Sequence, residues 1–519
     1  MPITAPFFPI IYVRGYAGND SEIEDTVSDP YMGFNLGSTK LRQLWTGKVE
    51  RHYFESPLVR LMKDFGYRDV YSAGLDMVPD RPLDPKSIII YRYYDKVSAD
   101  FGGGEQLRME TFGADLNDLI ERVRDSVCTD PADRESFKVY LVGHSMGGLV
   151  IRCFLQNDAI GRPETKALVD KAFTYATPHN GIELEIIGNV PSFFTRNSAD
   201  NFNRERMAQY LGLPAGTDPV HSLNGRFDAD RFFCLVGTNA KDYAVASGWS
   251  SRVVGPFSDG LVRIANAAVT ALTGIPDCPE RLAPRAFVHR SHSGPYGIVN
   301  SEEGYQNLTR FLFGNVRVEG VLEVHALSLP EDIQAFKDGG QQIRASYHFE
   351  CVTRVRGANW DLSRRLAAEN STVFRKFGEL FPDKAENYDR PHHDRPQLFT
   401  TYLNAASRVD PQRPSLGFSL DLGVLVPEYE VDGVLWLKNH YPGGYLFREK
   451  FNLEAIPPEE PAGQWRLRYG TDSTSPNRTT QDAVGTPTAG GLEFRIPVVQ
   501  RTRPGIEAML VLTAAPWNS

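Results

Sequence analysis

The sequence predicts a two-domain protein: an N-terminal α/β domain built on a mostly parallel sheet, followed by a C-terminal antiparallel β-sandwich. Three observations predict this arrangement. In residues 1–315, short apolar runs alternate with longer amphipathic stretches, as strands joined by helices do. In residues 316–519, the hydrophobic period is two, and turn residues separate the apolar runs. The chain has 519 residues, which is enough for about two to four domains with cores of their own.

The strands expected in the first domain are short runs rich in branched and aromatic residues: Pro9 to Val13, Ser87 to Tyr94, Lys138 to Val142, Lys171 to Tyr175, Arg231 to Val236 and Arg285 to His289. A helix is expected between the second and third runs, because apolar residues recur there at three- and four-residue spacing: Phe112, Leu116, Leu119, Val123 and Val127. A last amphipathic helix, Glu302 to Phe313, closes this domain.

Alternation of apolar and polar residues predicts the strands of the second domain: Gln342 to Val355, Phe418 to Val426, Gly444 to Leu453, Trp465 to Tyr469, Leu492 to Val498 and Ile506 to Leu512. Turn signals such as Asp432-Gly433 separate them, and this combination is typical of a β-sandwich. A helical and Pro/His-rich insert at about residues 359–411 interrupts the pattern, and its place in the fold is left open.

Charge and cysteine content exclude several classes of protein. The formal net charge is −9, and no cluster of Lys and Arg offers a site for nucleic acid or an anionic membrane. The five cysteines are far apart and form no CxxC pair, which favours reduced thiols over disulfides or a metal site. The sequence has no signal-peptide pattern and no apolar window long enough to span a membrane. We therefore expect a cytoplasmic protein.

A strand, a Gly-x-Ser-x-Gly turn and a helix follow one another without a break from Lys138 to Gln156. A serine hydroxyl is a poor nucleophile, so catalysis requires a strained turn that exposes it beside a base. Glycines at 143 and 147 would let neighbouring elements approach more closely than a Cβ permits. Ser145 would then stand at the positive end of the helix, where the N–H of Met146 points at the oxygen that gains charge. The alternative is a glycine-rich turn without chemistry.

A nucleophile on such a turn requires an acid and then a histidine, each at the end of a later strand. Asp259 lies in a loop after the Arg231 to Val236 strand, and His292 follows the Arg285 to His289 strand. The chain order Ser145, Asp259, His292 matches this requirement. His292 would take the serine proton and pass it to the leaving group, while Asp259 would hold the imidazole tautomer and stabilise the imidazolium.

Other residues compete for these roles. His289 is the nearest rival base, but a buried, hydrogen-bonded histidine is the ordinary expectation at the end of a strand. His144, inside the turn, is expected to pack under the serine. Asp242 competes with Asp259 for the acid role, although a loop carboxylate is usually solvated.

The second oxyanion donor is expected from the glycine-rich loop after the first strand, and we assign it to the N–H of Tyr16. The alternative is that this loop is only a β-to-α turn. Loss of one such donor typically costs roughly a hundred- to a thousandfold in rate.

Several motifs together resemble a known family: RGYAG at 14–18, GHSMGG at 143–148, YATPHNG at 175–181, SDGLV at 258–262 and SHSG at 291–294. They resemble the lipase/esterase branch of the α/β-hydrolase superfamily, most closely bacterial lipases and the group similar to the GPI-inositol deacylase. The resemblance covers roughly residues 8–315. It implies a hydrolase that acts through an acyl-enzyme, with a triad of Ser145, Asp259 and His292 and oxyanion donors at Tyr16 and Met146.

One residue departs from this family. The family usually has His-Gly in the first loop, whereas this chain has Arg14-Gly15. A guanidinium at this position could pair with a nearby acid or recognise an anionic substrate.

Two long insertions are expected to shape specificity: Asn19 to Lys86 and Ile182 to Asp230. The second (about residues 182–230) contains an apolar stretch, which predicts either a mobile lid over an acyl pocket or a fixed cap. The adjacent histidines His392 and His393 are expected to lie in a solvated loop, and His179 to order its own turn, so no metal site is predicted.

The function expected from these observations is hydrolysis of carboxylic esters, including lipids, by a cytoplasmic serine esterase or lipase without a cofactor. An apolar acyl group is expected, and the C-terminal sandwich would dock a partner or present the substrate. The alternatives are an amidase, thioesterase or acyltransferase with the same triad, or a catalytically silent binding protein.

Overall fold

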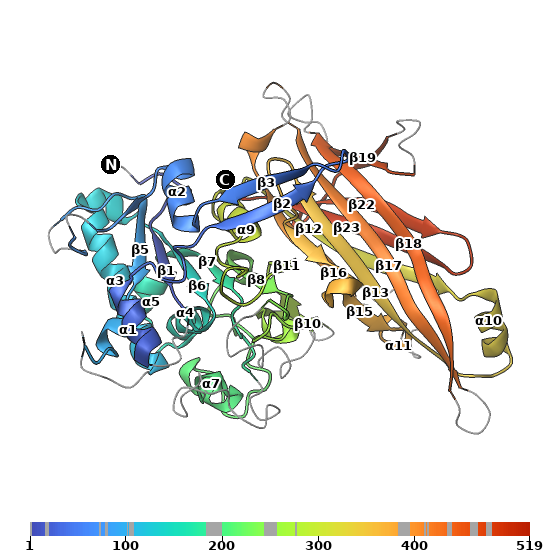
Figure 1. Cartoon of the computed structure of the whole chain (residues 1–519), viewed down its shortest axis with the longest axis horizontal. Helices are drawn as coiled ribbons and strands as arrows, with labels where there is room; N and C mark the ends of the chain where they lie inside the picture. Colours follow the sequence, from blue (N-terminus) through green and yellow to red (C-terminus); the bar gives the residue numbers. More distant parts are fainter. Residues whose placement is uncertain are drawn as a thin grey trace. The chain divides into compact units, whose positions relative to one another are not determined.

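The computed structural model describes residues 3–15, 20–71, 74–77, 81–100, 102, 108–182, 200–242, 257–275, 278–381, 395–408, 412, 415–432, 438–456, 465–473 and 480–518. The chain divides into two compact units, Met1–Phe313 and Gly314–Ser519 (Figure 1).

A parallel sheet forms the centre of the first unit (Figure 1). Among the described residues it has seven strands in the order β11-β8-β7-β6-β1-β5-β4. Every neighbouring pair is parallel. The strands are β1 (Ile10–Val13), β4 (Arg68–Asp69), β5 (Ser87–Tyr91), β6 (Val139–His144), β7 (Val169–Tyr175), β8 (Phe232–Gly237) and β11 (Arg285–Val288). The predicted α/β class with a mostly parallel sheet is confirmed.

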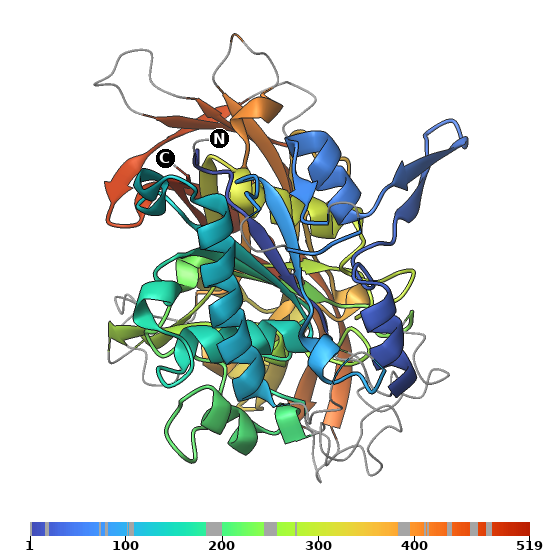
Figure 2. The ribbon, with the colours of Figure 1, turned by 90° about the vertical axis from the view of Figure 1, so that its left-hand side faces the viewer.

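Helices cover both faces of this sheet, and the alternation of side chains along each strand explains why both faces are apolar. On one face, Ile11 and Val13 of β1 join the core formed with α3 (Met109–Val127) and α4 (Met146–Gln156). Figure 2 shows α3 crossing in front of the sheet. On the other face, Phe311 of α9 (Glu302–Phe313) packs against aromatic rings of β7 and β8, with centroids 5.9 and 5.3 Å away.

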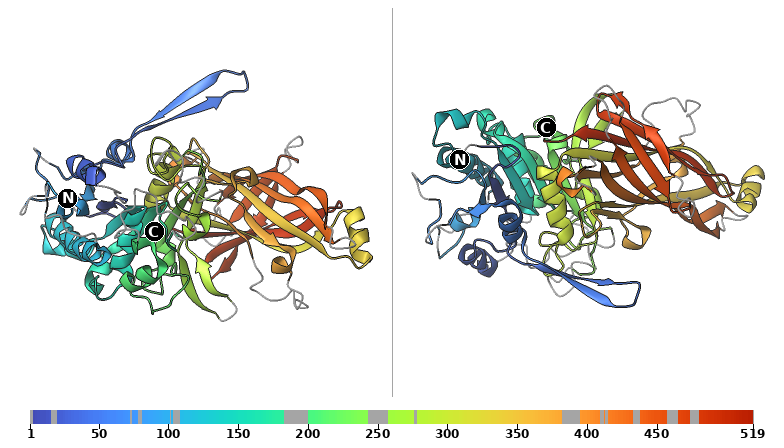
Figure 3. Two further views of the ribbon diagram at one scale, coloured as in Figure 1. Left: turned by 60° about the horizontal axis from the view of Figure 1, so that its bottom comes forward. Right: turned by 90° about the horizontal axis from the view of Figure 1, so that it is seen from above.

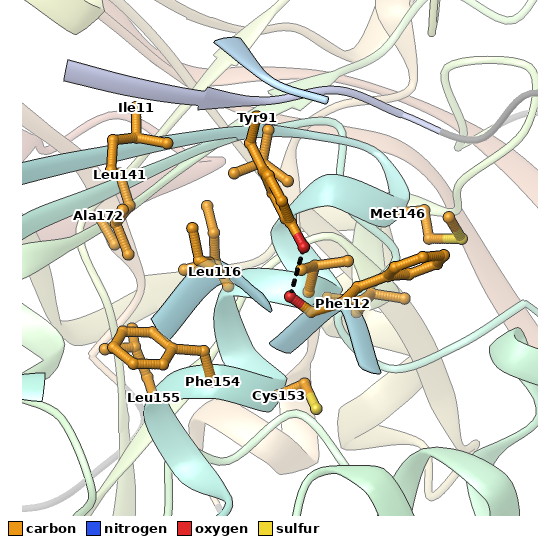
Figure 4. Packing of buried hydrophobic residues seen from close by; sticks show 14 of the residues in the cluster. Ile11, Tyr91, Phe112, Leu116, Leu141, Met146, Cys153, Phe154, Leu155 and Ala172 are labelled. Carbon is orange, nitrogen blue, oxygen red and sulfur yellow. Dashed lines mark hydrogen bonds between the residues drawn. The ribbon is translucent and has the colours of Figure 1, made fainter. Parts of the chain in front are cut away.

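A buried hydrogen bond joins α3 to the sheet (Figure 4). The hydroxyl of Tyr91, at the end of β5, donates a hydrogen bond of 2.8 Å to the carbonyl of Phe112 in α3. Leu116 and Leu141 are fully buried beside it. This contact satisfies the phenol of an otherwise apolar interface and fixes α3 against the strand that neighbours β1.

In the described part of the first unit, the other α-helices and strands are α1 (Asp20–Ser28), β2 (Ser38–Gln43), β3 (Val49–Phe54), α2 (Pro57–Phe65), α5 (Pro163–Lys166), α7 (Arg204–Tyr210), β9 (Thr270–Ile275) and β10 (Cys278–Leu282). Strands β2 and β3 pair as an antiparallel hairpin that extends away from the parallel sheet of its unit (Figure 3). Trp45 in its turn is 97% exposed. The sequence patterns did not predict this hairpin, because almost none of its side chains is buried and the apolar signal is therefore weak.

The second unit contains two antiparallel sheets, in agreement with the prediction. Among the described residues one sheet has the order β16-β12-β23-β22-β21, and the other β14-β13-β17-β18-β19-β20 with β15 on β13. The strands are β12 (Val316–Ser328), β13 (Ile343–Val355), β14 (Ser363–Arg365), β15 (Val373–Lys376), β16 (Gln397–Leu403), β17 (Leu416–Asp432), β18 (Lys438–Ile456), β19 (Arg466–Thr471), β20 (Gln481–Val484), β21 (Thr486–Thr488), β22 (Gly491–Gln500) and β23 (Gly505–Pro516).

One hydrophobic core joins the two sheets, because residues of both contribute to a single buried cluster, from Leu322 on β12 to Leu422 on β17. The described residues of this unit also form two short α-helices, α10 (Glu331–Asp338) and α11 (Phe377–Leu380). The insert at 359–411, which the sequence left unplaced, supplies β14, β15, α11 and β16, while residues 382–394 lie outside the described part.

In the described part of the chain, every helix is too short or too polar to cross a membrane.

We predict that Leu116→Ala destabilises the first unit by about 2–5 kcal/mol, since it leaves a cavity between α3 and the sheet. This change is measured by urea unfolding in which hydrogen exchange of peptides from residues 109–127 is the probe. Arg122→Ala, at an exposed position of the same helix, is the matched control and should change the free energy of unfolding by less than about 0.5 kcal/mol. Equal effects of the two changes would show that the α3 face is not tightly packed.

Candidate active site

Ser145 stands on a strained turn between β6 and α4. Its backbone angles are φ 50° and ψ −122°, a combination that is costly for a residue with a side chain. The turn is held from both sides: the N–H of Ser145 donates to the carbonyl of Tyr175, and the hydroxyl of Thr177 donates to the carbonyl of Ser145, each over 2.9 Å. These bonds from the end of β7 compensate part of the strain and fix the direction of the serine side chain.

Glycines allow this turn to pack closely. A Cβ on Gly147 would lie 2.1 Å from the carbonyl oxygen of Val13, and a Cβ on Gly143 would lie 2.7 Å from the nitrogen of Gly148. On the opposing loop, a Cβ on Gly15 would lie 2.9 Å from Nδ1 of His144. The backbone contacts of Gly143 and Gly147 leave no room for a side chain, as the sequence pattern predicted.

The structure brings Ser145, His292 and Asp259 into one hydrogen-bonded row. Nε2 of His292 lies 2.9 Å from Oγ of Ser145, and Nδ1 of His292 lies 2.9 Å from Oδ2 of Asp259. A carboxylate only accepts hydrogen bonds, so in the neutral imidazole Nδ1 carries the proton and donates to it. Nε2 is then the acceptor that faces the serine hydroxyl.

Backbone bonds around the carboxylate hold the row in place. Oδ1 of Asp259 accepts from the N–H groups of Leu261 and Val262, at 3.0 and 2.7 Å. The backbone N–H of His292 donates to the carbonyl of Asp259 over 3.0 Å, so the two loops are joined directly. Gly237, which ends β8, makes this approach possible, since a Cβ there would lie 2.8 Å from Cβ of Asp259.

All three side chains are almost completely buried: Ser145 is 4% exposed, His292 3% and Asp259 1%. Burial matters here because a proton transfer between hydrogen-bonded groups is less disturbed by competing water, and the hydrogen bonds are stronger at lower dielectric. The row can therefore pass a proton from hydroxyl to imidazole and stabilise the resulting cation with the carboxylate.

His144 lies directly beside the row and stays neutral. Burial lowers its pKa to about 3, with smaller contributions in the same direction from the charges of His292 and Arg14. Its Nε2 donates to the carbonyl of His292 over 3.0 Å, which fixes the tautomer and supports the loop that holds His292. As expected from the sequence, this residue packs under the site, and its Nε2 is already engaged with the backbone.

The two rival residues lie elsewhere. His289 is exposed, and its Nδ1 lies 3.2 Å from the hydroxyl of Thr238; the expectation of a buried histidine at this strand end is therefore wrong, although the hydrogen bond is present. Asp242 is exposed and accepts a hydrogen bond of 2.6 Å from the side chain of Asn239.

Met146 is the first residue of α4, so its N–H is among those at a helix start that have no partner within the helix. Tyr16, the predicted second oxyanion donor, lies outside the described residues, as do residues 183–199 of the expected lid and His392 and His393. Groups of three or more His, Cys, Asp or Glu side chains that could hold a metal ion are absent from the part of the chain that the structure describes.

Arg152 is a supporting residue that the sequence patterns did not reveal. It is fully buried in α4, and it donates to four acceptors: the side chain of Gln156 and the carbonyls of His179, Val220 and Ser222. It thereby ties α4 to the loop after β7 and to residues 220–222. A charged residue in the otherwise apolar run after Gly148 was the available signal.

His179 orders its own turn, as expected. Its Nε2 lies 3.0 Å from the hydroxyl of Thr174, and its ring is fully buried. Burial keeps its pKa well below the usual value, with Arg152 adding to the effect, so the ring is neutral.

The parallel strand order and the serine turn between β6 and α4 define an α/β-hydrolase fold. Residues 104–276 match the family model described as a PGAP1-like alpha/beta domain. This match confirms the resemblance to the lipase and esterase branch.

Solved structures are also similar to the chain, at low sequence identity. The mature lipase BlEst2 from Bacillus licheniformis is 15% identical, with a TM-score of 0.29, and the match covers 60% of this chain and 93% of that one. Phospholipase PlaB from Legionella pneumophila, in complex with thio-NAD, is 12% identical with a TM-score of 0.32, covering 84% and 89%. Among curated proteins, no match is found.

We predict that stability depends on pH through His144. Below pH 6.5 the unfolded chain binds a proton at this imidazole that the folded protein, with a pKa of about 3, does not bind. Unfolding is therefore favoured as pH falls from 6.5 towards 3. From pH 6.5 to 5.5 the wild type should lose about 1 kcal/mol more free energy of unfolding than His144→Gln, whose amide can still donate to the carbonyl of His292.

Urea unfolding of both proteins at the two pH values measures this difference, because other titrating groups contribute equally and cancel. Identical losses in wild type and variant would mean that His144 binds its proton in the folded state as well.

Proposed function

We propose that this protein is a serine hydrolase that cleaves carboxylic esters with an apolar acyl group through an acyl-enzyme. The observation on which this proposal rests is the buried row of Ser145, His292 and Asp259 on a strained strand-to-helix turn. The choice of an ester rests on the sequence motifs shared with lipases and esterases. The choice of an apolar acyl group rests on the apolar residues of the 182–230 insertion.

In the first step, Oγ of Ser145 attacks the ester carbonyl while Nε2 of His292 takes the hydroxyl proton. The new C–O bond leaves a negative charge on the carbonyl oxygen. His292 then gives its proton to the leaving alcohol as the ester bond breaks, and Asp259 stabilises the imidazolium in between. The distance of 2.9 Å between Nε2 and Oγ is within the range for direct transfer.

The oxyanion is stabilised by the N–H of Met146 at the positive end of α4 and, in this proposal, by the N–H of Tyr16. Water then attacks the acyl-enzyme with His292 as base, which releases the acid and restores Ser145. Neither step requires a metal or cofactor.

We further propose that the protein works in the reducing environment of the cytoplasm. Four of its five cysteines, Cys128, Cys153, Cys234 and Cys351, are free and buried. Burial raises the pKa of each of these thiols, which keeps them protonated and unreactive.

Ser145→Ala and His292→Ala should each lower kcat by about a millionfold, and the double variant should be little worse than either, since the pair acts as one unit. Asp259→Asn should lower kcat by about ten thousandfold, because the amide favours the wrong imidazole tautomer. Steady-state kinetics with p-nitrophenyl butyrate measures these changes. Asp242→Asn, at the exposed rival acid, is the matched control.

Labelling by a fluorophosphonate separates this proposal from a catalytically silent binding protein. Wild type should be labelled and Ser145→Ala should not. A wild type that is folded but unlabelled would favour the silent protein, and a His292→Ala enzyme that keeps most of its activity would assign the base to another histidine.

Substrate preference separates an esterase from the other enzymes with this triad. We expect kcat/KM to rise with acyl chain length along a series of p-nitrophenyl esters, and to exceed the values for matched anilides and thioesters. Fastest cleavage of the anilides or thioesters would instead indicate an amidase or thioesterase. Transfer of the acyl group to added alcohols in preference to water would indicate an acyltransferase.

A further inference from the structure

The residue that departs from the family motif, Arg14, lies in the loop that presses against Ser145. A Cβ on Gly15 would lie 3.1 Å from Cβ of Ser145, and a Cβ on Gly147 would lie 2.5 Å from the carbonyl oxygen of Arg14. The hydroxyl of Tyr93 fixes the backbone of Arg14 and Gly15. Its oxygen lies 3.0 and 3.1 Å from the two carbonyl oxygens, so that its proton is shared between them. The backbone of Arg14 and Gly15 is therefore well supported.

The guanidinium of Arg14 lies over an aromatic ring, with Cζ 5.6 Å from the centroid of Tyr94. This stacking orients a planar cation. Nε and Nη1 of Arg14 are buried, and among the described residues they have no hydrogen-bond partner. Within the described ranges, no carboxylate forms an ion pair with this side chain. The first possibility that the sequence left open, a pairing with a nearby acid, is thus unsupported.

A buried guanidinium nitrogen without a hydrogen-bond partner is unfavourable, and proteins usually satisfy such a group unless a ligand does so. Arg152 illustrates the contrast, because this fully buried arginine has four acceptors. The charge of Arg14 is also close enough to the site to contribute to the low pKa of His144, the neighbour of the proposed nucleophile.

We propose that Arg14 forms an anion subsite beside Ser145, and that the preferred substrates are esters that also carry a carboxylate or a phosphate. This inference rests on the proposed function and specifies its substrate class. Carboxylate and phosphate share the paired oxygen acceptors that fit the fork of a guanidinium. Arg14 acts in binding and specificity, whereas Ser145 and His292 act on the ester bond.

Two pairs of substrates test this subsite. The first is mono-p-nitrophenyl succinate and its methyl ester, which differ by a carboxylate on the acyl side. The second is dibutyrylglycerol phosphate and dibutyrylglycerol, which differ by a phosphate on the alcohol side. For wild type, kcat/KM should favour the charged member of at least one pair. In Arg14→Met this preference should fall by about ten- to hundredfold, the loss expected for a hydrogen-bonded charge.

Arg14→Lys should keep part of the preference, since it retains the charge but not the planar fork. Arg122→Met removes one positive charge at an exposed position and is the matched control, with the preference of wild type. The substrate pair whose charge preference falls in Arg14→Met identifies the preferred anion as carboxylate or phosphate.

A proportional loss on charged and neutral members in Arg14→Met would overturn the proposal, because it would assign Arg14 to loop structure alone. A wild type without preference in either pair would also overturn it. Both results leave the proposed function intact as long as Ser145→Ala abolishes turnover. If wild type hydrolyses no ester and is not labelled by a fluorophosphonate, the proposed function itself fails.

Discussion

The close approach of backbones around Ser145 is the constraint on which the rest of the site depends. The turn after β6 packs against the loop after β1 with separations that exclude a Cβ at Gly147. This contact requires β1 and β6 to be neighbours in a parallel sheet, because only then do both loops leave at the same edge. The strained φ of Ser145 is sustained by the bonds from Tyr175 and Thr177 at the end of β7. The geometry of the site therefore depends directly on the strand order of the sheet.

The same edge explains how residues 114 and 33 positions apart along the chain meet. Asp259 and His292 follow β8 and β11, which pair in parallel, so their loops leave the sheet side by side. The loops are then joined by the bond from the N–H of His292 to the carbonyl of Asp259. The neutral ring of His144 supports the same loop from beneath. A polar row inside an apolar interior is tolerated because each member is hydrogen-bonded.

The sequence predicted those features of the structure that depend on the local pattern of apolar residues. Six of the seven described parallel strands, all but β4, and helices α3 and α9 follow from hydrophobic periodicity, which burial on one or both faces produces. Ser145, Asp259 and His292 could be chosen from chain order, although sequence could not measure their separation. The hairpin of β2 and β3 was missed because its side chains are mostly exposed. The contacts of Arg152 were missed too, because three of its four acceptors, the carbonyls of His179, Val220 and Ser222, lie far from it in the chain.

The two arginines near the site show how partners distinguish a structural cation from one that awaits a ligand. Arg152 is completely buried, which lowers its pKa to about 10, and its four acceptors come from three separate segments. Its environment is complete without a ligand. Arg14 is only partly buried and stacks on Tyr94, yet two of its nitrogens have no acceptor in the part of the chain that the structure describes. A guanidinium in a protein interior is stabilised by oxygen acceptors, whether these come from the protein or from a ligand. The protein supplies them to Arg152, whose role is therefore structural. It does not supply them to two nitrogens of Arg14, which is why we assign Arg14 to substrate binding.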